Sequence, residues 1–195
     1  SLSNNSGEHA QPTVYNGVMY VVNGNWTFAI DVATGRQIWR TPSGHETAAL
    51  RVAGGGALMR GTATIFEGKL FRQTLDAHVV ALDMKTGKQI WKTKYAEWKE
   101  GYKGVVAPII ANGVLVSGMG GGDSTTRGFV EGYDPDTGKV HWYLKGPTEQ
   151  YVASLVYNEK ADLLFLTAGF PQHHLLGLRH GHPRPGRGLG GHQAR

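Results

Sequence analysis

The sequence predicts an all-β protein of the β-propeller class, in which four-stranded antiparallel sheets, called blades, pack face to face around an axis. Three observations support this prediction. The motif D-x-x-T-G-x-x-x-W occurs three times, within residues 29–39, 81–91 and 132–142. Two short apolar runs separated by Asn-Gly or Glu-Gly precede each copy. Glycine supplies 29 of the 195 residues, which favours many turns over long helices.

The first repeat shows how each blade is expected to form. The pair Asn16-Gly17 separates the runs PTVY and VMYVV, and it favours a tight hairpin because both residues tolerate a positive φ. Within the motif, Asp31 is expected to cap a second turn and Gly35 to supply its left-handed position. Each repeat therefore predicts strand, turn, strand, connection, strand, turn and strand.

The three copies recur at intervals of 52 and 51 residues, which is about the length of one blade. We predict blades near residues 12–42, 63–94 and 107–145, and an incomplete fourth blade near 152–171. Together they make a partial propeller of about three and a half blades over residues 8–171. A closed ring needs more blades than this.

Two sets of repeated residues are expected to be structural. A tryptophan can cover apolar area between adjacent blades while its indole N–H reaches a carbonyl. The aspartates of the motif are typical turn formers rather than paired catalytic carboxylates. These residues are Trp39, Trp91 and Trp142, and Asp31, Asp83 and Asp134.

The third repeat contains an insertion that its sister repeats lack. From hairpin glycine to turn aspartate the separations are 14, 15 and 21 residues, and the extra residues fall in GMGGGDSTTRG at 118–128. A structural requirement common to all blades does not explain an insertion in one of them. Glycines let a planar or anionic ligand approach the backbone, and the carboxylate of Asp123 can bind a hard cation. The alternative is a loose connection without a function.

A second candidate position precedes the first strand of each blade. His9, Arg60 and Val105 are equivalent in the aligned repeats, and this position faces the axis of a propeller. Arg60 stands among small residues, AGGGALMRG, and its guanidinium could hold carboxylates in a bidentate manner. The alternative is a solvated arginine at the rim.

Composition excludes several classes of protein. There is no cysteine, so disulfides, thiolate metal sites and a cysteine nucleophile are ruled out. The apolar runs are too short for a membrane span, and Ser1–Ala10 lacks the pattern of a signal peptide.

The C-terminal residues 172–195 differ in character from the rest. They carry four arginines, five of the nine histidines and no acid, so the remaining residues account for only +1 of the net charge of +5. A metal-binding or RNA-binding tail is one interpretation, but the composition favours a disordered or frame-shifted tail. Because the body is almost neutral, we do not expect nucleic acid as a partner.

Two stretches carry a resemblance to a known family. MRGTATIFEGKLFRQTLDAHVVALDMKTGKQIW and APIIANGVLVSGMGGGDSTTRGFVEGYDPDTGKVHW are similar to pyrroloquinoline quinone (PQQ) dependent alcohol dehydrogenases of the methanol and ethanol type. The resemblance covers about residues 8–170. It implies an eight-bladed periplasmic quinoprotein that contains calcium or a lanthanide, with this chain as its first blades.

The resemblance also implies roles for single residues. Asp123 stands where the family has a metal-binding glutamate, and Arg60 matches an arginine that contacts the quinone. His9 stands near a family glutamate, whereas Val105 replaces a quinone-contacting threonine. The glycines that match the loop lining the quinone plane are Gly120, Gly121 and Gly122.

The implied activity is the oxidation of a primary alcohol by hydride transfer to the quinone, with the metal as Lewis acid. A small alcohol and a cytochrome c or similar electron acceptor would be the partners. The family's catalytic base belongs to a later blade, so no catalytic residue is assigned and the isolated chain is expected to be inactive. The alternative is a non-catalytic propeller for binding or assembly, resembling the outer-membrane assembly lipoproteins that share the tryptophan repeat.

Overall fold

The computed structural model describes residues 10–49, 61–120, 126–146, 155–168 and 173–179. Blade 1 comprises β1 (Thr13–Tyr15), β2 (Val18–Val22), β3 (Trp26–Asp31) and β4 (Gln37–Pro42). Blade 2 comprises β5 (Thr64–Phe66), β6 (Lys69–Thr74), β7 (His78–Asp83) and β8 (Gln89–Lys94). Blade 3 comprises β9 (Ile109–Ala111), β10 (Val114–Gly118), β11 (Phe129–Tyr133) and β12 (Val140–Lys145). The fourth sheet comprises β13 (Val156–Asn158), β14 (Leu163–Ala168) and β15 (His174–Arg179). A 3-10 turn, η1 (Trp98–Glu100), follows β8.

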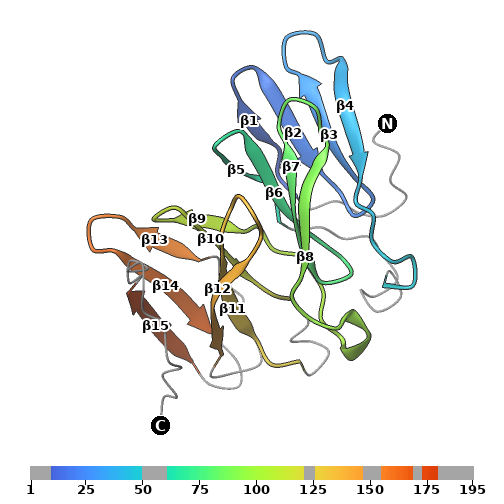
Figure 1. Cartoon of the computed structure of the whole chain (residues 1–195). Helices are drawn as coiled ribbons and strands as arrows, with labels where there is room; N and C mark the ends of the chain where they lie inside the picture. The colour runs from blue at the N-terminus through green and yellow to red at the C-terminus, as the bar shows by residue number, and fades with distance from the viewer. Residues whose placement is uncertain (1–9, 50–60, 121–125, 147–154, 169–172, 180–195) are drawn as a thin grey trace.

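The four sheets form an open part of a propeller. Within each sheet the strands pair antiparallel in chain order, and the sheets follow one another from β1–β4 at the top of Figure 1 to β13–β15 at the lower left. The first strands of neighbouring blades meet: the Oγ1 atoms of Thr13 and Thr62 lie 2.8 Å apart, and Thr64 Oγ1 donates to the carbonyl of Pro108. The prediction of an all-β, unclosed propeller is confirmed. No helix among the described residues is long and apolar enough to cross a membrane.

The hairpin turns form where the sequence predicts them. Asn16 and Gly17 have φ values of 48° and 76°, as a two-residue turn between twisted strands requires. The equivalent pairs in blades 2 and 3 also have positive φ, and they are Glu67 and Gly68, and Asn112 and Gly113. The same local chemistry therefore starts each of the three blades.

The aspartates of the repeated motif are turn formers. The Asp31 carboxylate accepts hydrogen bonds of 2.7 Å from both the backbone N–H and the hydroxyl of Thr34, and Gly35 follows with a φ of 69°. The same bonds recur at Asp83 with Thr86. The hydrogen bond from the Thr34 hydroxyl is the main reason that the pKa of Asp31 lies below its ordinary value. The structural interpretation of these carboxylates is confirmed.

The tryptophans of the motif connect neighbouring blades. Trp39 of blade 1 donates its indole N–H to the carbonyl of Met84 in blade 2 at 3.0 Å. Trp91 of blade 2 makes the same bond to the carbonyl of Pro135 in blade 3, also at 3.0 Å. The expected position between blades is therefore confirmed for Trp39 and Trp91.

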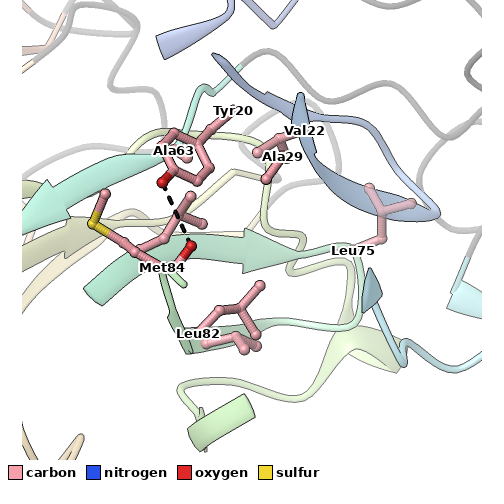
Figure 2. Packing of buried hydrophobic residues seen from close by; sticks show 9 residues of the cluster. Tyr20, Val22, Ala29, Ala63, Leu75, Leu82 and Met84 are labelled. Atoms are coloured by element: carbon pink, nitrogen blue, oxygen red, sulfur yellow. Dashed lines mark hydrogen bonds between the residues drawn. The ribbon is translucent and has the colours of Figure 1, made fainter. Parts of the chain in front are cut away.

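Apolar side chains fill the spaces between blades. Figure 2 shows the cluster between blades 1 and 2, where Tyr20 and Ala29 of blade 1 pack with Leu82 and Met84 of blade 2. The Tyr20 hydroxyl donates to the Met84 carbonyl at 3.5 Å, the dashed line in Figure 2. A second cluster lies between blades 2 and 3, and a third between blade 3 and the fourth sheet. Each blade thus buries its faces against its neighbours, as a repeat architecture requires.

The fourth sheet extends into the segment for which we expected no strand. Strand β15 pairs with β14 from Leu163↔Arg179 to Ala168↔His174. Leu176 and Leu178 alternate with exposed residues and pack against the third apolar cluster. This period of two is the physical reason for the strand, and the surrounding His, Gly and Arg residues hid it in the sequence. Residues 180–195 lie outside the described residues.

Candidate functional site

The two ends of each blade carry different loops. The first hairpin turn and the aspartate turn lie together, since Val32 N donates to Gly17 O and Met84 N to Gly68 O, both at 3.0 Å. We call this the turn end. Because the strands are antiparallel, the loops between second and third strands and the connections between blades lie at the opposite end, the connection end. The glycine-rich segment 118–128 joins β10 to β11 and therefore belongs to the connection end of blade 3.

Only part of the predicted site falls within the described residues. Gly120 is described, and so is Val105, which occupies the position equivalent to His9 and Arg60. The other predicted site residues lie outside the described residues, and they are His9, Arg60, Gly121, Gly122 and Asp123. Their predicted roles stay predictions.

Residues 103–107, which we call the inner strap, join two of the predicted segments. Gly61, the residue after Arg60, donates its N–H to the carbonyl of Val105 at 2.8 Å. Gly120 and Lys103 of the strap also exchange backbone hydrogen bonds of 2.9 and 3.2 Å. The strap therefore brings the residue next to Arg60 and the first predicted loop glycine into contact with one short segment.

Both glycines are packed too closely for a side chain. A Cβ atom at Gly61 would lie 2.1 Å from the carbonyl carbon of Val106. A Cβ atom at Gly120 would lie 2.7 Å from Val105 Cγ2 and 3.0 Å from the carbonyl oxygen of Lys103. Gly120 thus has an intramolecular reason to lack a side chain, in addition to the predicted role beside a cofactor.

A buried glutamine holds the strap to β10. Gln73 is fully buried, and its Nε2 donates to Ser117 Oγ at 2.8 Å and to the carbonyl of Gly118 at 2.5 Å. Its Oε1 accepts from the backbone N–H of Val106 at 3.0 Å. Sequence reasoning missed this residue. The signal was present in KLFRQTLD, where two polar residues replace the Val-Val of blade 1.

The side chain of the preceding residue, Arg72, hydrogen-bonds to blade 1 rather than to blade 3. Its guanidinium donates to the carbonyls of Asn23 at 2.8 Å and Trp26 at 2.9 Å, and to Thr27 Oγ1 at 2.9 Å. Burial lowers the pKa of Arg72 to about 9, against the opposing effect of Asp76. The guanidinium is therefore still charged near neutral pH, and its donors are used between blades.

A charged cleft of about 440 Å³ lies at the connection end of blades 1 and 2. It is lined by Gly44, Glu46, Asp76, His78, Lys92, Lys94 and Trp98. Burial would raise the pKa of Asp76, but hydrogen bonds from His78 and Thr74 and the nearby charges of His78 and Lys92 outweigh it and hold that pKa well below its usual range. Across the described ranges no group of three or more His, Asp or Glu side chains is placed to hold a metal ion. Within the cleft, Asp76 lies 3.3 Å from both Lys92 Nζ and His78 Nδ1.

Two further polar groups mark the region where the glycine-rich segment ends. Thr126 is buried and its Oγ1 has no hydrogen-bond partner among the described residues, which costs about 1–3 kcal/mol unless something else supplies a partner. Glu131 is buried beside Tyr133, whose hydroxyl donates to its carboxylate. Burial raises the pKa of Glu131, and the bond from Tyr133 opposes that change.

These observations test whether a PQQ cofactor fits the described residues. PQQ is a planar polyanion, so its site needs close approach to the backbone and spare hydrogen-bonding groups. The described part of the segment offers the Thr126 hydroxyl, which has no partner among the described residues, and the strap holds both Gly61 and Gly120 by backbone hydrogen bonds. In these two respects the chain fits the cofactor that the sequence predicts.

Comparisons with known proteins agree with the fold. Residues 2–162 match the PQQ family, described as glucose/ethanol/alcohol dehydrogenase, β-propeller domain. The chain is 35% identical over 158 residues to the quinoprotein alcohol dehydrogenase PedH of Pseudomonas putida, a match that covers 78% of this chain and 25% of that protein. It is 32% identical over 173 residues to the lanthanide-dependent methanol dehydrogenase of Methylacidiphilum fumariolicum, covering 86% and 27%. A europium-containing methanol dehydrogenase superimposes with a TM-score of 0.75 at 24% identity, over 86% of this chain and 36% of that chain.

The extent of these matches defines what the chain shares with its relatives. It spans about a quarter of the length of the two curated relatives, whereas most of the chain is covered in each match. The family match includes the three tryptophan repeats and the glycine-rich segment. The chain therefore belongs to the PQQ family of glucose, ethanol and other alcohol dehydrogenases, and it carries part of the family's β-propeller domain.

Proposed function

We propose that the connection end of blades 2 and 3 binds PQQ together with a calcium or lanthanide ion, as part of an enzyme that oxidises primary alcohols. The observation that carries this proposal is the inner strap, which contacts both Gly61 and Gly120. Two segments that the sequence links to the cofactor thus share one neighbour, although 59 residues separate these glycines in the chain. Membership of the PQQ family supports the same cofactor.

Each predicted residue has a distinct task in this proposal. Arg60 would donate hydrogen bonds to cofactor oxygens, because a guanidinium pairs with carboxylates in a bidentate manner. Asp123 would be a metal ligand, and Gly120, Gly121 and Gly122 would allow close approach to the ring plane. His9 would lie at the edge of the cofactor. Thr126 would gain the hydrogen-bond partner that it lacks among the described residues.

The chemistry also explains why this chain alone should not turn over. Bound PQQ would supply a two-electron acceptor, and its metal ion would supply a Lewis acid. Calcium takes about six to eight oxygen ligands, and Asp123 offers one carboxylate. No residue of this chain is assigned as the general base that must take the proton of the alcohol. We therefore propose binding by this chain and turnover only where further blades complete the site.

The remaining partners follow from the proposed reaction. The substrate would be a small primary alcohol, and the electrons would pass to a cytochrome c or a similar acceptor. The periplasm is the proposed compartment. These three proposals depend on family membership rather than on a contact among the described residues.

A titration of the purified chain with PQQ, with calcium or lanthanum present, tests the binding proposal. We expect binding that needs the metal, and a loss of at least about tenfold in affinity for Asp123→Ala and for Arg60→Ala, since one lost charged contact is worth at least 1.4 kcal/mol. Glu159→Ala and Arg36→Ala change exposed residues of like charge in turns of the fourth sheet and of blade 1, and they serve as matched controls.

Two results would contradict the proposal. A parent chain that binds no PQQ at any metal concentration would favour the non-catalytic binding or assembly propeller. An Asp123→Ala chain that binds PQQ and metal as tightly as the parent would show that the metal ligand was wrongly assigned. Mixing the loaded chain with an alcohol and a dye acceptor tests the expected inactivity, and steady dye reduction would disprove it.

A further inference from the structure

We infer that Gln73 is a positioning residue for the proposed cofactor site, which it does not itself touch. It fixes the inner strap and the end of β10 relative to each other, and so fixes where the glycine-rich segment begins. This inference rests on the proposed function for its effect on cofactor binding. That Gln73 fixes the two backbone segments follows from its hydrogen bonds and does not depend on the proposed function.

The side-chain amide of Gln73 matches its surroundings in every hydrogen-bonding group. A primary amide has two N–H donors and one carbonyl acceptor. The donors serve Ser117 Oγ and the Gly118 carbonyl, and the acceptor serves the N–H of Val106. One side chain thereby ties the strap to β10, between backbone positions that are 12 residues apart in the chain.

The strap also lies directly on the backbone of blade 2. A Cβ atom at Gly104 would lie 2.8 Å from Gln73 Cβ and 2.3 Å from the carbonyl oxygen of Thr74. The strap therefore has Gly61 and Gly120 as backbone partners and Gln73 as a side-chain partner. A shift of Gln73 would therefore shift the strap, and with it the Gly61 and Gly120 segments of the proposed site.

Comparison of the blades separates this role from a general need of the fold. Counted from the hairpin glycine, the residues equivalent to Gln73 are Val22 in blade 1 and Gly118 in blade 3. Neither can make these side-chain bonds, and both blades form the same four-stranded sheet. Burying an amide is unfavourable unless all its groups are paired, so its presence in one blade indicates a local task.

The glutamine is itself firmly anchored. Successive residues of a strand point to opposite faces, and Arg72 binds blade 1 while Gln73 binds blade 3. The Nε of Arg72 also donates to the backbone carbonyl of Gln73 at 3.0 Å. Both side chains of this pair are fully buried, so solvent does not compete for their bonds.

Two substitutions in the full chain test the inference through amide hydrogen exchange. Gln73→Leu removes all three bonds, so we expect faster exchange at the amides of Val106 and Gly120. In its ionised form Gln73→Glu keeps an acceptor for the Val106 N–H but has no hydrogen to donate to the Gly118 carbonyl. We therefore expect Gln73→Glu to speed exchange at Gly120 while Val106 stays protected. A uniform loss of stability would not produce this split.

The matched control is Thr93→Val, which removes a hydrogen bond of 2.9 Å between the same two blades, from β8 to the carbonyl of Gly138 in the aspartate turn of blade 3. In titrations with PQQ and calcium, we expect about a tenfold higher Kd for both Gln73 variants, as the loss of one buried hydrogen bond would give, and an unchanged Kd for Thr93→Val.

Equal exchange at Gly120 in Gln73→Leu and the parent would overturn the inference, as would equal Kd values. A Thr93→Val chain that loses as much affinity for PQQ as the Gln73 variants would overturn the inference too. A parent chain that binds no PQQ would overturn the proposed function instead, and the exchange split would still decide whether Gln73 holds the two segments.

Discussion

The two ends of the blades are built on different principles. At the turn end the same contacts recur from blade to blade: an aspartate turn, a tryptophan N–H to a turn carbonyl, and a glycine under the indole ring. At the connection end some contacts also recur, such as those of Thr13 and Thr64 with the next blade, but among the described residues the buried polar side chains of Arg72, Gln73 and Glu131 each occur in a single blade. Contacts that repeat serve the stacking of blades, whereas contacts found once are the ones that a specific site can use.

The largest effect on stability is expected at the turn end. Trp91 is 9% exposed and packs against Gly138 of the next blade, where an added Cβ would lie 2.6 Å from the indole. Trp91→Ala should lower the free energy of unfolding by about 3–5 kcal/mol, as for other large-to-small changes in cores. Urea denaturation followed by tryptophan fluorescence and circular dichroism would measure it. A loss below about 1 kcal/mol would contradict the assembly role of the turn end.

A pair of glycine substitutions sharpens the comparison within the turn end. Gly138 and Gly35 occupy the same turn with φ values of 70° and 69°, so alanine costs about 1–2 kcal/mol at either position for its backbone alone. No described residue lies within 4 Å of a Cβ at Gly35, whereas Trp91 and Thr93 crowd Gly138.

Overpacking should therefore destabilise Gly138→Ala by about a further 1–3 kcal/mol. The same term is absent for Gly35→Ala. The measured quantity is the difference between the two denaturation midpoints, with Gly35→Ala as the control for the backbone cost. Equal midpoints would show that the tryptophan does not depend on the glycine beneath it.

The sequence could predict the turn end because its determinants are local. Asn16-Gly17 and Asp31 act on residues three or four positions away, so the pattern in the chain contains the whole interaction. Apart from the bond that joins these two residues, the partners of the Arg72 and Gln73 side chains are backbone atoms and hydroxyls between 33 and 49 residues away. A local pattern can mark such residues as unusual but cannot name their partners.

The candidate site shows the same limit. The insertion at 118–128 could be found by comparing the repeats, because the separation from hairpin glycine to turn aspartate is longer in the third repeat than in the other two. The inner strap could not, since its packing on Gly61 and Gly120 depends on how two blades stack. Strand β15 was missed for a different reason: a composition rich in His, Gly and Arg outweighed the alternation of Leu176 and Leu178.

An intermediate effect is expected from the charged cleft at the connection end. Asp76 is buried and accepts bonds from Lys92 and from the Glu46 N–H, both at 3.3 Å. Asp76→Asn should lower the free energy of unfolding at neutral pH by about 1–3 kcal/mol, because it leaves charged donors without their acceptor. Since the folded pKa of Asp76 is lowered from 3.8, the advantage of the parent is present above that pH and is lost as the pH falls below it.

Glu131→Gln is a control for that pH dependence, because the stability difference between it and the parent should change with pH in the opposite direction. Its folded pKa is raised above 4.5 because burial disfavours the charged form. The parent therefore loses stability relative to Glu131→Gln as the pH rises from 4.5 through the folded pKa. Denaturation curves between pH 3 and pH 8 measure both differences. Parallel curves for the parent and Asp76→Asn would show that the carboxylate is not the group that titrates.

The smallest effect on stability, and the most informative about function, is expected at Thr126. Its buried hydroxyl has no partner in the part of the chain that the structure describes, so Thr126→Val should leave the cofactor-free chain as stable as the parent or more stable by about 1 kcal/mol. Thr93→Val, which loses a satisfied bond to the aspartate turn of blade 3, should instead lose about 1 kcal/mol. The order reverses for PQQ binding, where we expect Thr126→Val to weaken the affinity and Thr93→Val to leave it unchanged. If both variants lost stability and neither lost affinity, the Thr126 hydroxyl would be an ordinary structural group and the distinction between the two ends would not extend to the cofactor.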